Sequence, residues 1–379
     1  MRAKPKPHLS LQESQPAQAS GLLAWLHIDL PLLSSLLLLA GIGLAILYSA
    51  SDKEMVLLQR QLLRLGFGFM AMLALAQIHP DNIRRWSPWL YGIGILMLFA
   101  VILFGESGKG AQRWLDLGII RFQPSEMFKL ILPMLIAWFL AEHRLPPTPS
   151  RMVAAGLFTL IPVLLIAKQP DLGTALLVGT GGAFALFLAG IGWRLISAIG
   201  LGMAALGPVA WYFMHEYQRQ RVLTFLTPES DPLGTGYHII QSKIAIGSGG
   251  ISGKGWLNGT QSHLEFLPER HTDFIFAVIS EEFGLVGIMA LLSLYLFIIM
   301  RGLYIATQAQ DTFGRILAGS LSLVFFVYLF VNAGMVTGLL PVVGVPLPLI
   351  SYGGTSLVTI LASFGMLMSI HTHKKLLPT

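Results

Sequence analysis

A succession of long apolar runs, each about the length needed to cross a bilayer, most limits what this 379-residue chain can fold into. The hydrocarbon core of a membrane is about 30 Å thick, and roughly 20 helical residues cross it. The mean hydropathy of the chain is +0.68. The sequence therefore predicts an all-α polytopic integral membrane protein with about ten transmembrane helices. We expect them near residues 29–50, 60–79, 88–105, 124–141, 152–167, 174–190, 195–213, 272–300, 313–338 and 350–370.

Composition excludes several other classes of protein. The apolar runs are continuous and do not alternate with polar residues, which argues against a transmembrane β-barrel. The chain has no cysteine, so it forms neither disulfides nor thiolate metal sites. Its net charge of +6 is explained by basic loops beside anionic lipid, and nucleic-acid binding is not expected. Residues 1–20 are polar and basic without an apolar core, which predicts a cytoplasmic tail and not a signal peptide. Residues 21–379 are expected to form a single membrane domain.

The density of Lys and Arg in short loops predicts the orientation. Short connections on the side of the N-terminus are rich in these residues, which favours N- and C-termini on the cytoplasmic side of the membrane. Two longer loops, near 106–123 and 214–271, then lie on the outer side. The second connects the expected spans 7 and 8.

The first of these loops and the helix after it carry several charges. Lys109 and Arg113 lie among glycines, and Gln-Pro-Ser-Glu at 123–126 resembles a helix start. Glu126 and Lys129 are three residues apart, so they share a helix face and can pair. They form either a local ion pair or a charged wall of a cavity, since such charges are costly in lipid. The two readings are compatible.

A second group of polar residues follows the apolar runs further along the chain. Asp171 follows a proline-broken join and either caps the next helix or adds an acid to the periplasmic rim. Arg219, Arg221 and Lys243 lie in the long loop, near the glycine run at 247–255. Such a run can cradle phosphate, although flexible loops are also glycine-rich. The segment YHIIQSKIAI is expected to be a helix lying at the membrane interface.

An apolar segment near the C-terminus, residues 332–356, is interrupted by prolines and glycines. A loop this apolar is best placed folded back into the protein at membrane depth. Ser351 then lies among small polar groups at a helix start.

Asp273 is an isolated carboxylate within HTDFIFAVI. We expect one helix from 273 to 300, with Asp273 at the top of a cleft about 12 Å beyond Glu281 and Glu282. Partial shielding can raise and tune the pKa of such a carboxyl group, which suits a general base. The alternatives are that Asp273 caps its helix or pairs with Arg270, and His271 is a competing base.

Long motifs from the first loop to the end of the chain resemble the SEDS (shape, elongation, division and sporulation) family, and its rod-shape branch in particular. They include KGAQRWLDLG (109–118), QPDLGT (169–174), YQRQRV (217–222), FLPERHTDFIFAVISEE (266–282) and GLLPVVGVPLPLISYGGTS (338–356). The resemblance implies a ten-span peptidoglycan glycosyltransferase that polymerises lipid II on the outer face of the membrane. It also implies a class B penicillin-binding protein and other membrane proteins of the elongation complex as partners.

The resemblance places the family's essential aspartate at Asp273. We assign Glu126, Lys129, Asp171 and Ser351 to the cavity, and Lys109, Arg113, Arg219, Arg221 and Lys243 to the pyrophosphate or to substrate capture. No organic cofactor is expected, while a divalent cation, Mg²⁺ or Mn²⁺, is a candidate helper with no assigned ligands. Two alternatives stay open, a flippase for a lipid-linked precursor and a non-catalytic scaffold of the elongation complex.

Overall fold

The computed structural model describes most of the chain. The described residues are 26–108, 111–116, 121–192, 216–231, 234–263, 266–267 and 269–373, with positions 197, 200–202, 205, 207–208, 211–212 and 214. The expected tail (1–20), Lys109 and much of the expected span 195–213 lie outside the described residues.

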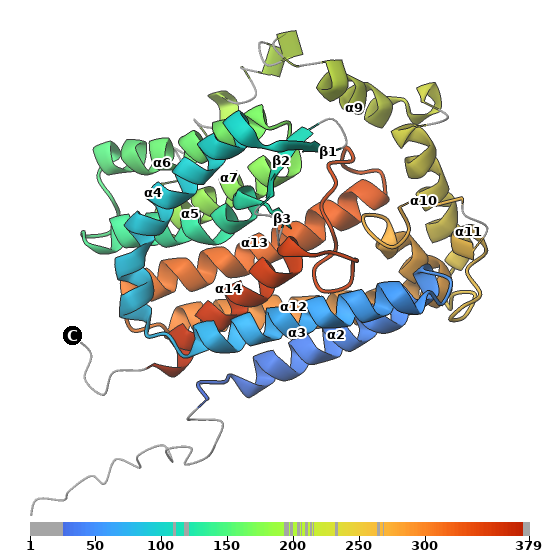
Figure 1. Ribbon diagram of the computed structural model, residues 1–379, viewed down its shortest axis with the longest axis horizontal. Helices are drawn as coiled ribbons and strands as arrows, with labels where there is room; N and C mark the ends of the chain where they lie inside the picture. The colour runs from blue at the N-terminus through green and yellow to red at the C-terminus, as the bar shows by residue number, and fades with distance from the viewer. Residues whose placement is uncertain are drawn as a thin grey trace, which may run out of the picture.

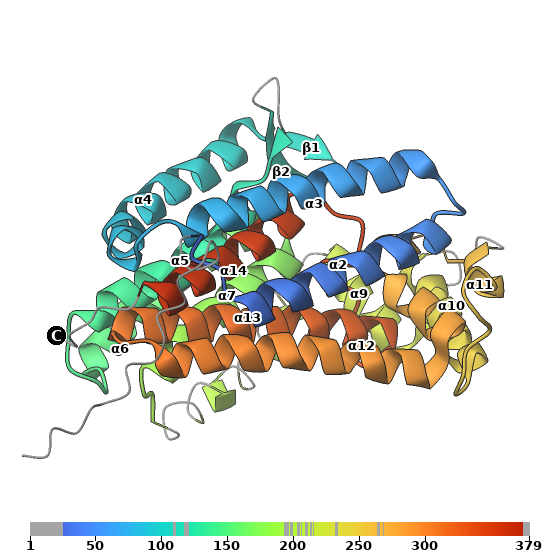
Figure 2. The same ribbon diagram turned by 90° about the horizontal axis from the view of Figure 1, so that it is seen from below.

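The described part is a bundle of long helices that run side by side (Figures 1 and 2). Two of these helices are α3 (Met55–Ala76), which packs on α14, and the shorter apolar α7 (Leu172–Leu188), which packs on α6 and α13. The prediction of an all-helical membrane protein is confirmed, and the count of ten spans stays a prediction. Seven described helices are long and apolar enough to cross a membrane: α2 (Leu30–Ala50), α4 (Pro80–Phe104), α5 (Pro124–Ala141), α6 (Pro149–Lys168), α12 (Ile275–Gln308), α13 (Thr312–Val336) and α14 (Thr355–Thr372).

The bundle has two ends, which we call the terminal face and the loop face. At the terminal face the rings of His27 and His373 stack with centroids 3.8 Å apart. The first and last described segments therefore meet at the same end of the bundle. A chain that crosses a membrane an even number of times has its two ends on one side, so this arrangement fits an even number of spans. The loop face is the opposite end, where the α2–α3 turn and the connection from α4 to α5 lie (Figure 1).

Short polar residues and prolines begin several of these helices. The Asp29, Asp171 and Asp311 carboxylates accept backbone N–H bonds at the starts of α2, α7 and α13. Such bonds satisfy N–H groups that have no partner within the helix. The helix α5 starts at Pro124 with Glu126 in its first turn, as the sequence predicts.

The loop face contains more regular structure than the sequence indicates. The connection expected as a loop near 106–123 forms a small antiparallel sheet in the order β1 (Glu106–Gly108), β2 (Ala111–Asp116) and β3 (Arg121–Phe122). The long loop contains α9 (Glu216–Leu226), the 3-10 turn Pro228–Ser230, α10 (Thr235–Gly249) and α11 (Thr260–His263). The expected helix at YHIIQSKIAI is therefore present as α10.

The helix expected over 273–300 is wrong in its start and in its continuity. It begins at Ile275, and it is broken at Gly284, where φ is 61° and ψ is −161°. Residues 250–255 pair with the break: the Lys254 and Gly255 N–H groups donate to the Glu281 and Glu282 carbonyls, at 3.0 and 2.9 Å. The Leu285 and Val286 N–H groups donate to Gly250 and Ile251 at 3.0 and 3.1 Å. A loop distant in sequence thus supplies the bonds that the broken helix lacks.

Candidate active site

The candidate site is built around residues 338–354, which we call the re-entrant segment. The Tyr295 hydroxyl, in the middle of α12, donates to the Pro348 carbonyl at 2.6 Å. A Cβ at Gly43 of α2 would lie only 2.6 Å from the Leu349 carbonyl oxygen. Contact with the middle of two membrane helices confirms that this segment folds back to membrane depth. The Pro348, Val345 and Ser351 carbonyls accept from protein side chains, as irregular backbone at that depth requires.

Asp273 lies in a turn against the re-entrant segment and is half-buried. The Asn332 amide donates to the Asp273 and Val345 carbonyls, at 3.0 and 2.8 Å. The Ser351 hydroxyl donates to Thr272 O at 2.7 Å. A Cβ at Gly344 would lie 3.5 Å from Asp273 Oδ2, so the carboxylate faces that glycine. The backbone on both sides of the carboxylate is therefore fixed.

The structure bears on the two structural alternatives for Asp273. The N-cap residue of α12 is Phe274, and no side chain caps this helix, so the capping alternative is wrong. The Arg270 guanidinium donates to the Asp52 carboxylate in the α2–α3 turn. The His271 ring meets the Tyr352 ring edge-on with centroids 6.2 Å apart, and its carbonyl accepts from Tyr352 N at 2.8 Å. Asp273 thus lies in the turn before α12 and does not cap that helix.

The sequence predicts Asp273 further toward the loop face than Glu281 and Glu282, and its contacts place it deeper in the bundle instead. Ser351, which contacts its turn, accepts at its carbonyl from Gln61 Nε2 at 3.2 Å. Gln61 is six residues into α3, or about 9 Å along the axis from the loop-face end. Glu282 is instead bonded by Ser49 at the loop-face end of α2. The break at Gly284 allows Asp273 to lie deeper in the bundle than the sequence predicts.

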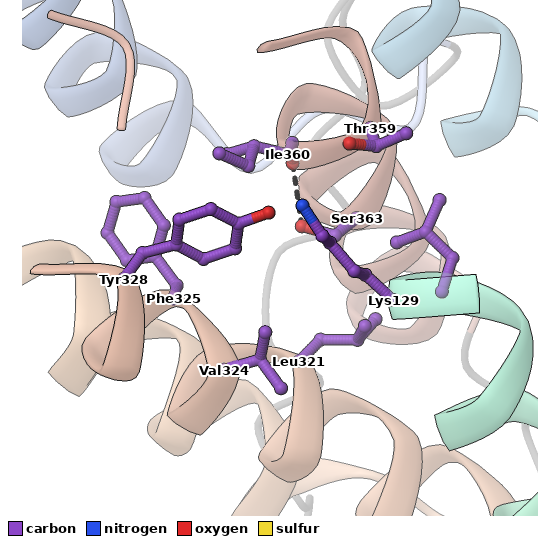
Figure 3. Close-up of a pocket in the computed structure, with 9 residues that line it drawn as sticks. Lys129, Leu321, Val324, Phe325, Tyr328, Thr359, Ile360 and Ser363 are labelled. Atoms are coloured by element: carbon purple, nitrogen blue, oxygen red, sulfur yellow. Dashed lines mark hydrogen bonds between the residues drawn. The ribbon is translucent and has the colours of Figure 1, made fainter. Parts of the chain in front are cut away.

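Glu126 and Lys129 form the predicted pair. The Lys129 Nζ to Glu126 Oε1 distance is 2.5 Å, and both residues are 5% exposed. Lys129 also lies 4.9 Å from the centroid of the Tyr328 ring, and the Tyr328 hydroxyl is 3.4 Å from Ser356 Oγ. Figure 3 shows the Lys129 ammonium and the Tyr328 hydroxyl directed toward each other across a pocket between α5, α13 and α14. Its volume of about 20 Å³ holds about one water.

Asp171 caps α7 and belongs to a second polar cluster. The Gln123 amide donates to Asp171 Oδ2 at 2.9 Å, and Arg113 Nε lies 3.9 Å from the same oxygen. The Arg113 guanidinium also donates to the Pro170 carbonyl. A Cβ at Gly173 would lie 2.7 Å from Val343 O, so this cluster borders the re-entrant segment beside Gly344. Asp171 therefore caps its helix, as one reading predicts, its role as a rim acid stays a prediction, and Arg113 has contacts that fix it there.

The other basic residues lie at different places on the loop face. Lys243 covers the re-entrant segment, because a Cβ at Gly338 would lie 2.7 Å from its Nζ. Arg219 donates to the Trp211 and Tyr212 carbonyls at 3.0 and 2.7 Å, contacts local to α9. Arg221 lies on the same helix. Lys109 lies outside the described residues, and phosphate contact by these residues stays a prediction.

Two glycines of the run at 247–255 make close backbone contacts, and phosphate binding by this run stays a prediction. A Cβ at Gly249 would lie 2.0 Å from Ser280 O, and one at Gly253 would lie 2.2 Å from Glu282 O. Lys254 pairs with the buried Glu281 at 2.7 Å. These residues serve the break in α12.

Two side chains of the site are absent from the sequence assignments. Asn332 is fully buried within the apolar run of α13. Arg64 lies in α3 with its guanidinium carbon 4.4 Å from the centroid of the Tyr352 ring. Asn332 is a lone polar residue in an apolar run, a signal that the sequence does contain, whereas Arg64 follows Gln59, Arg60 and Gln61 and is not marked out in this way. Within the described residues, no group of three or more His, Asp or Glu side chains is placed to hold a metal ion. A divalent cation stays a prediction.

Comparison with known proteins identifies the family. Residues 22–376 match the profile of the FtsW, RodA and SpoVE proteins, described as cell cycle proteins. The chain belongs to this family. It is 56% identical to the peptidoglycan glycosyltransferase MrdB of Escherichia coli over 352 residues, 93% of this chain and 95% of MrdB. It is 31% identical to the peptidoglycan glycosyltransferase RodA of Treponema pallidum, covering 91% of this chain and 98% of RodA.

Two solved structures have the same fold as this chain. The Thermus thermophilus rod shape determining protein RodA has a TM-score of 0.70 at 30% identity, covering 93% of this chain and 99% of that one. A chain from work described as "Structural coordination of polymerization and crosslinking by a peptidoglycan synthase complex" has a TM-score of 0.80 at 32% identity, with 92% and 99% covered. The resemblance to the rod-shape branch is therefore confirmed.

Proposed function

We propose that this chain is a peptidoglycan glycosyltransferase that polymerises lipid II into β-1,4-linked glycan for cell elongation and rod shape. The observation that carries the proposal is the half-buried Asp273 turn, fixed by Asn332 and Ser351 at membrane depth, in a chain 56% identical to a peptidoglycan glycosyltransferase. A site at this depth can meet a substrate whose lipid tail stays in the bilayer.

The chemistry needs one base. The 4-hydroxyl oxygen of the acceptor sugar attacks the anomeric carbon of the donor, forming the new C–O bond with inversion. The bond from that carbon to the pyrophosphate oxygen breaks, and the electron pair leaves with the pyrophosphate. Asp273 takes the hydroxyl proton, a role worth typically about 10²–10⁴ in rate. The pyrophosphate leaves as an anion, so no second acid is required.

Cations stabilise the charge that develops on the leaving group. Lys243 is placed over the re-entrant segment and is our candidate among the predicted basic residues. Arg113 is held at Asp171 and Pro170, so we assign it to shaping the rim. Mg²⁺ or Mn²⁺ would supply further positive charge to the pyrophosphate.

The partner and the orientation are also part of the proposal. A structural relative comes from a complex that coordinates polymerisation with crosslinking, which supports a class B penicillin-binding protein as partner. We place the terminal face in the cytoplasm and the loop face in the periplasm of a bacterial inner membrane. The Lys and Arg distribution supports this placement.

The test is polymerisation of labelled lipid II by purified protein, alone and with its penicillin-binding partner. Asp273→Asn is expected to lower glycan synthesis by about 10²-fold or more while lipid II still binds. Asp311→Asn is the matched control, because asparagine also caps helices and Asp311 caps α13 at the terminal face. Glycan synthesis by Asp273→Asn at the wild-type rate would point to a scaffold. Transbilayer movement of lipid II without polymerisation would point to a flippase.

A further inference from the structure

Arg64 is a cation inside the membrane part of the bundle whose purpose the fold does not explain. It lies nine residues past the start of α3, about 14 Å along the helix axis from the loop-face end. Its side chain is half-buried. Charged side chains at such depth are rare and typically mark a functional site or a specific partner.

The partner of Arg64 in the described part of the chain is an aromatic ring and not an acid. Its guanidinium carbon lies 4.4 Å from the centroid of the Tyr352 ring, and no described carboxylate lies within 4.0 Å of its nitrogens. Other basic side chains in this structure form ion pairs: Lys129 pairs with Glu126, and Arg301 pairs with Asp29. Stacking uses the flat face of a guanidinium and leaves the N–H donors at its edge for a ligand.

The stacked Arg64 belongs to the scaffold that holds Asp273. Tyr352 donates its backbone N–H to the carbonyl of His271, at 2.8 Å. Its neighbour Ser351 bonds Thr272 at 2.7 Å. Gln61 lies one turn from Arg64 on α3. Its Nε2 donates to the Ser351 carbonyl at 3.2 Å, and its Oε1 accepts from Gly353 N at 3.4 Å. The guanidinium and the carboxylate are thus fixed to the same short stretch of backbone.

The environment of Arg64 fits an oxyanion that arrives with a lipid. A guanidinium edge matches two phosphate oxygens at once, which a lysine cannot do. Gly354 adjoins the guanidinium, since a Cβ there would lie 3.9 Å from Arg64 Nε without a clash. We propose that Arg64, stacked on Tyr352, binds the pyrophosphate of a polyprenyl-linked substrate beside Asp273. This proposal rests on the proposed function and names a ligand for one of its groups.

The experiment measures binding without turnover, using the full chain with its penicillin-binding partner in phosphatidylcholine nanodiscs. The probe is undecaprenyl pyrophosphate, titrated against wild type, Arg64→Gln, Arg64→Lys and Tyr352→Phe. Arg64→Gln is expected to weaken binding by about ten- to a hundredfold, the range for charge-assisted bonds. Arg64→Lys and Tyr352→Phe keep the charge and the ring, respectively, so they are expected to lie between wild type and Arg64→Gln. Arg85→Gln, at the exposed terminal-face end of α4, removes an equal charge and is expected to bind as wild type.

Several outcomes would overturn the proposal. Equal affinity of Arg64→Gln and Arg85→Gln for undecaprenyl pyrophosphate would show that Arg64 does not bind the pyrophosphate. Phosphatidylglycerol that competes as well as the probe would assign Arg64 to a phospholipid headgroup. If Arg64→Gln does not fold, Tyr352→Leu replaces it in the test, because leucine removes the ring on which Arg64 stacks. Tyr352→Leu is then expected to weaken binding of the probe, and unchanged affinity would contradict the proposal. A wild type that makes no glycan would refute the proposed function, while the binding data would still decide the role of Arg64.

Discussion

At the scale of single residues, Asn332 shows how one amide can join two distant segments. Its Nδ2 donates to the carbonyls of Asp273 and Val345, residues 59 and 13 positions away. Only an amide NH₂ offers two such donors in so small a neutral side chain. Asn332 and Val345 are buried, so the Val345 carbonyl depends on a protein donor. We infer that it is a positioning residue, which acts on the reaction by holding the Asp273 turn.

We expect Asn332→Leu to lower both stability and the rate of glycan synthesis. Leucine keeps the volume but leaves buried carbonyls unpaired, at about 1–3 kcal/mol each. Thermal unfolding and steady-state polymerisation of lipid II measure the two effects. A positioning role predicts a fall in kcat with KM near wild type. Ser322→Ala is the control, because Ser322 is buried on the same helix and its hydroxyl bonds the Ala318 carbonyl of that helix, at 2.7 Å. A stable Asn332→Leu protein with unchanged kcat would contradict the role.

At the scale of elements, the break in α12 lets one helix serve two purposes. The part after Gly284 crosses the bundle, and the part before it carries the Asp273 turn against the re-entrant segment. The break is stable because residues 250–255 complete its hydrogen bonds. Gly284 is required for two reasons: its φ of 61° disfavours other residues, and a Cβ would lie 2.4 Å from Gly253 N.

Gly284→Ala is therefore expected to destabilise the protein strongly and to abolish glycan synthesis. Both the strained backbone and the clash with a neighbouring backbone oppose the added methyl group, and each mechanism costs about 1–3 kcal/mol. Gly41→Ala is the matched control, since a Cβ there meets nothing within 4 Å. Alanine favours a helix over glycine, so this control should unfold at the wild-type temperature or above. Equal unfolding temperatures for the two variants would show that the break tolerates a side chain.

The contrast between these features shows what the sequence could predict. The Glu126–Lys129 pair was predictable, because two charges three residues apart meet on any helix. The re-entrant segment was predictable, because apolar backbone with several prolines cannot form a span or a surface loop. The break at Gly284 was not, because the hydrogen bonds that make it possible come from residues about thirty positions earlier. Tyr352, the partner of Arg64, likewise lies far away in the sequence.

At the scale of the whole molecule, charge is distributed between two faces with different tasks. On the terminal face Asp29 joins three helices, with Arg301 Nη2 at 2.6 Å and His371 Nδ1 at 2.9 Å from its Oδ2. Burial alone would raise the pKa of Asp29, yet the bonds from His371, Arg301 and Leu32 N hold that pKa well below its ordinary value. Its contribution to stability is therefore present at neutral pH and is lost only as the pH falls below the ordinary carboxyl range.

Asp29→Ala is expected to lower the free energy of unfolding by about 3 kcal/mol, because it leaves Arg301 partly buried without its acid. Lipid II binding should stay near wild type, since the loop face is unaltered. Thermal unfolding and lipid II titration measure the two quantities. Asp81→Ala is the control, because the side chain of Asp81 is 44% exposed. A loss of lipid II affinity as large as the loss of stability would show that the two faces are coupled.

His373 gives the terminal face a dependence on mild acid. Its ring stacks on His27 and meets the edge of His79, with centroids 5.2 Å apart. Burial lowers the pKa of His373, the nearby His27 and His79 lower it further, and the bond to Ser369 O opposes them. The unfolded chain therefore takes up a proton at higher pH than the folded one, so stability falls as the pH drops below about 6.5.

His373→Phe keeps an aromatic ring without the proton site. The unfolding temperature of wild type should fall relative to His373→Phe between about pH 7.5 and 5.5. His143→Phe, a histidine at the end of α5, should track wild type, and parallel curves for all three proteins would exclude His373 as the titrating group.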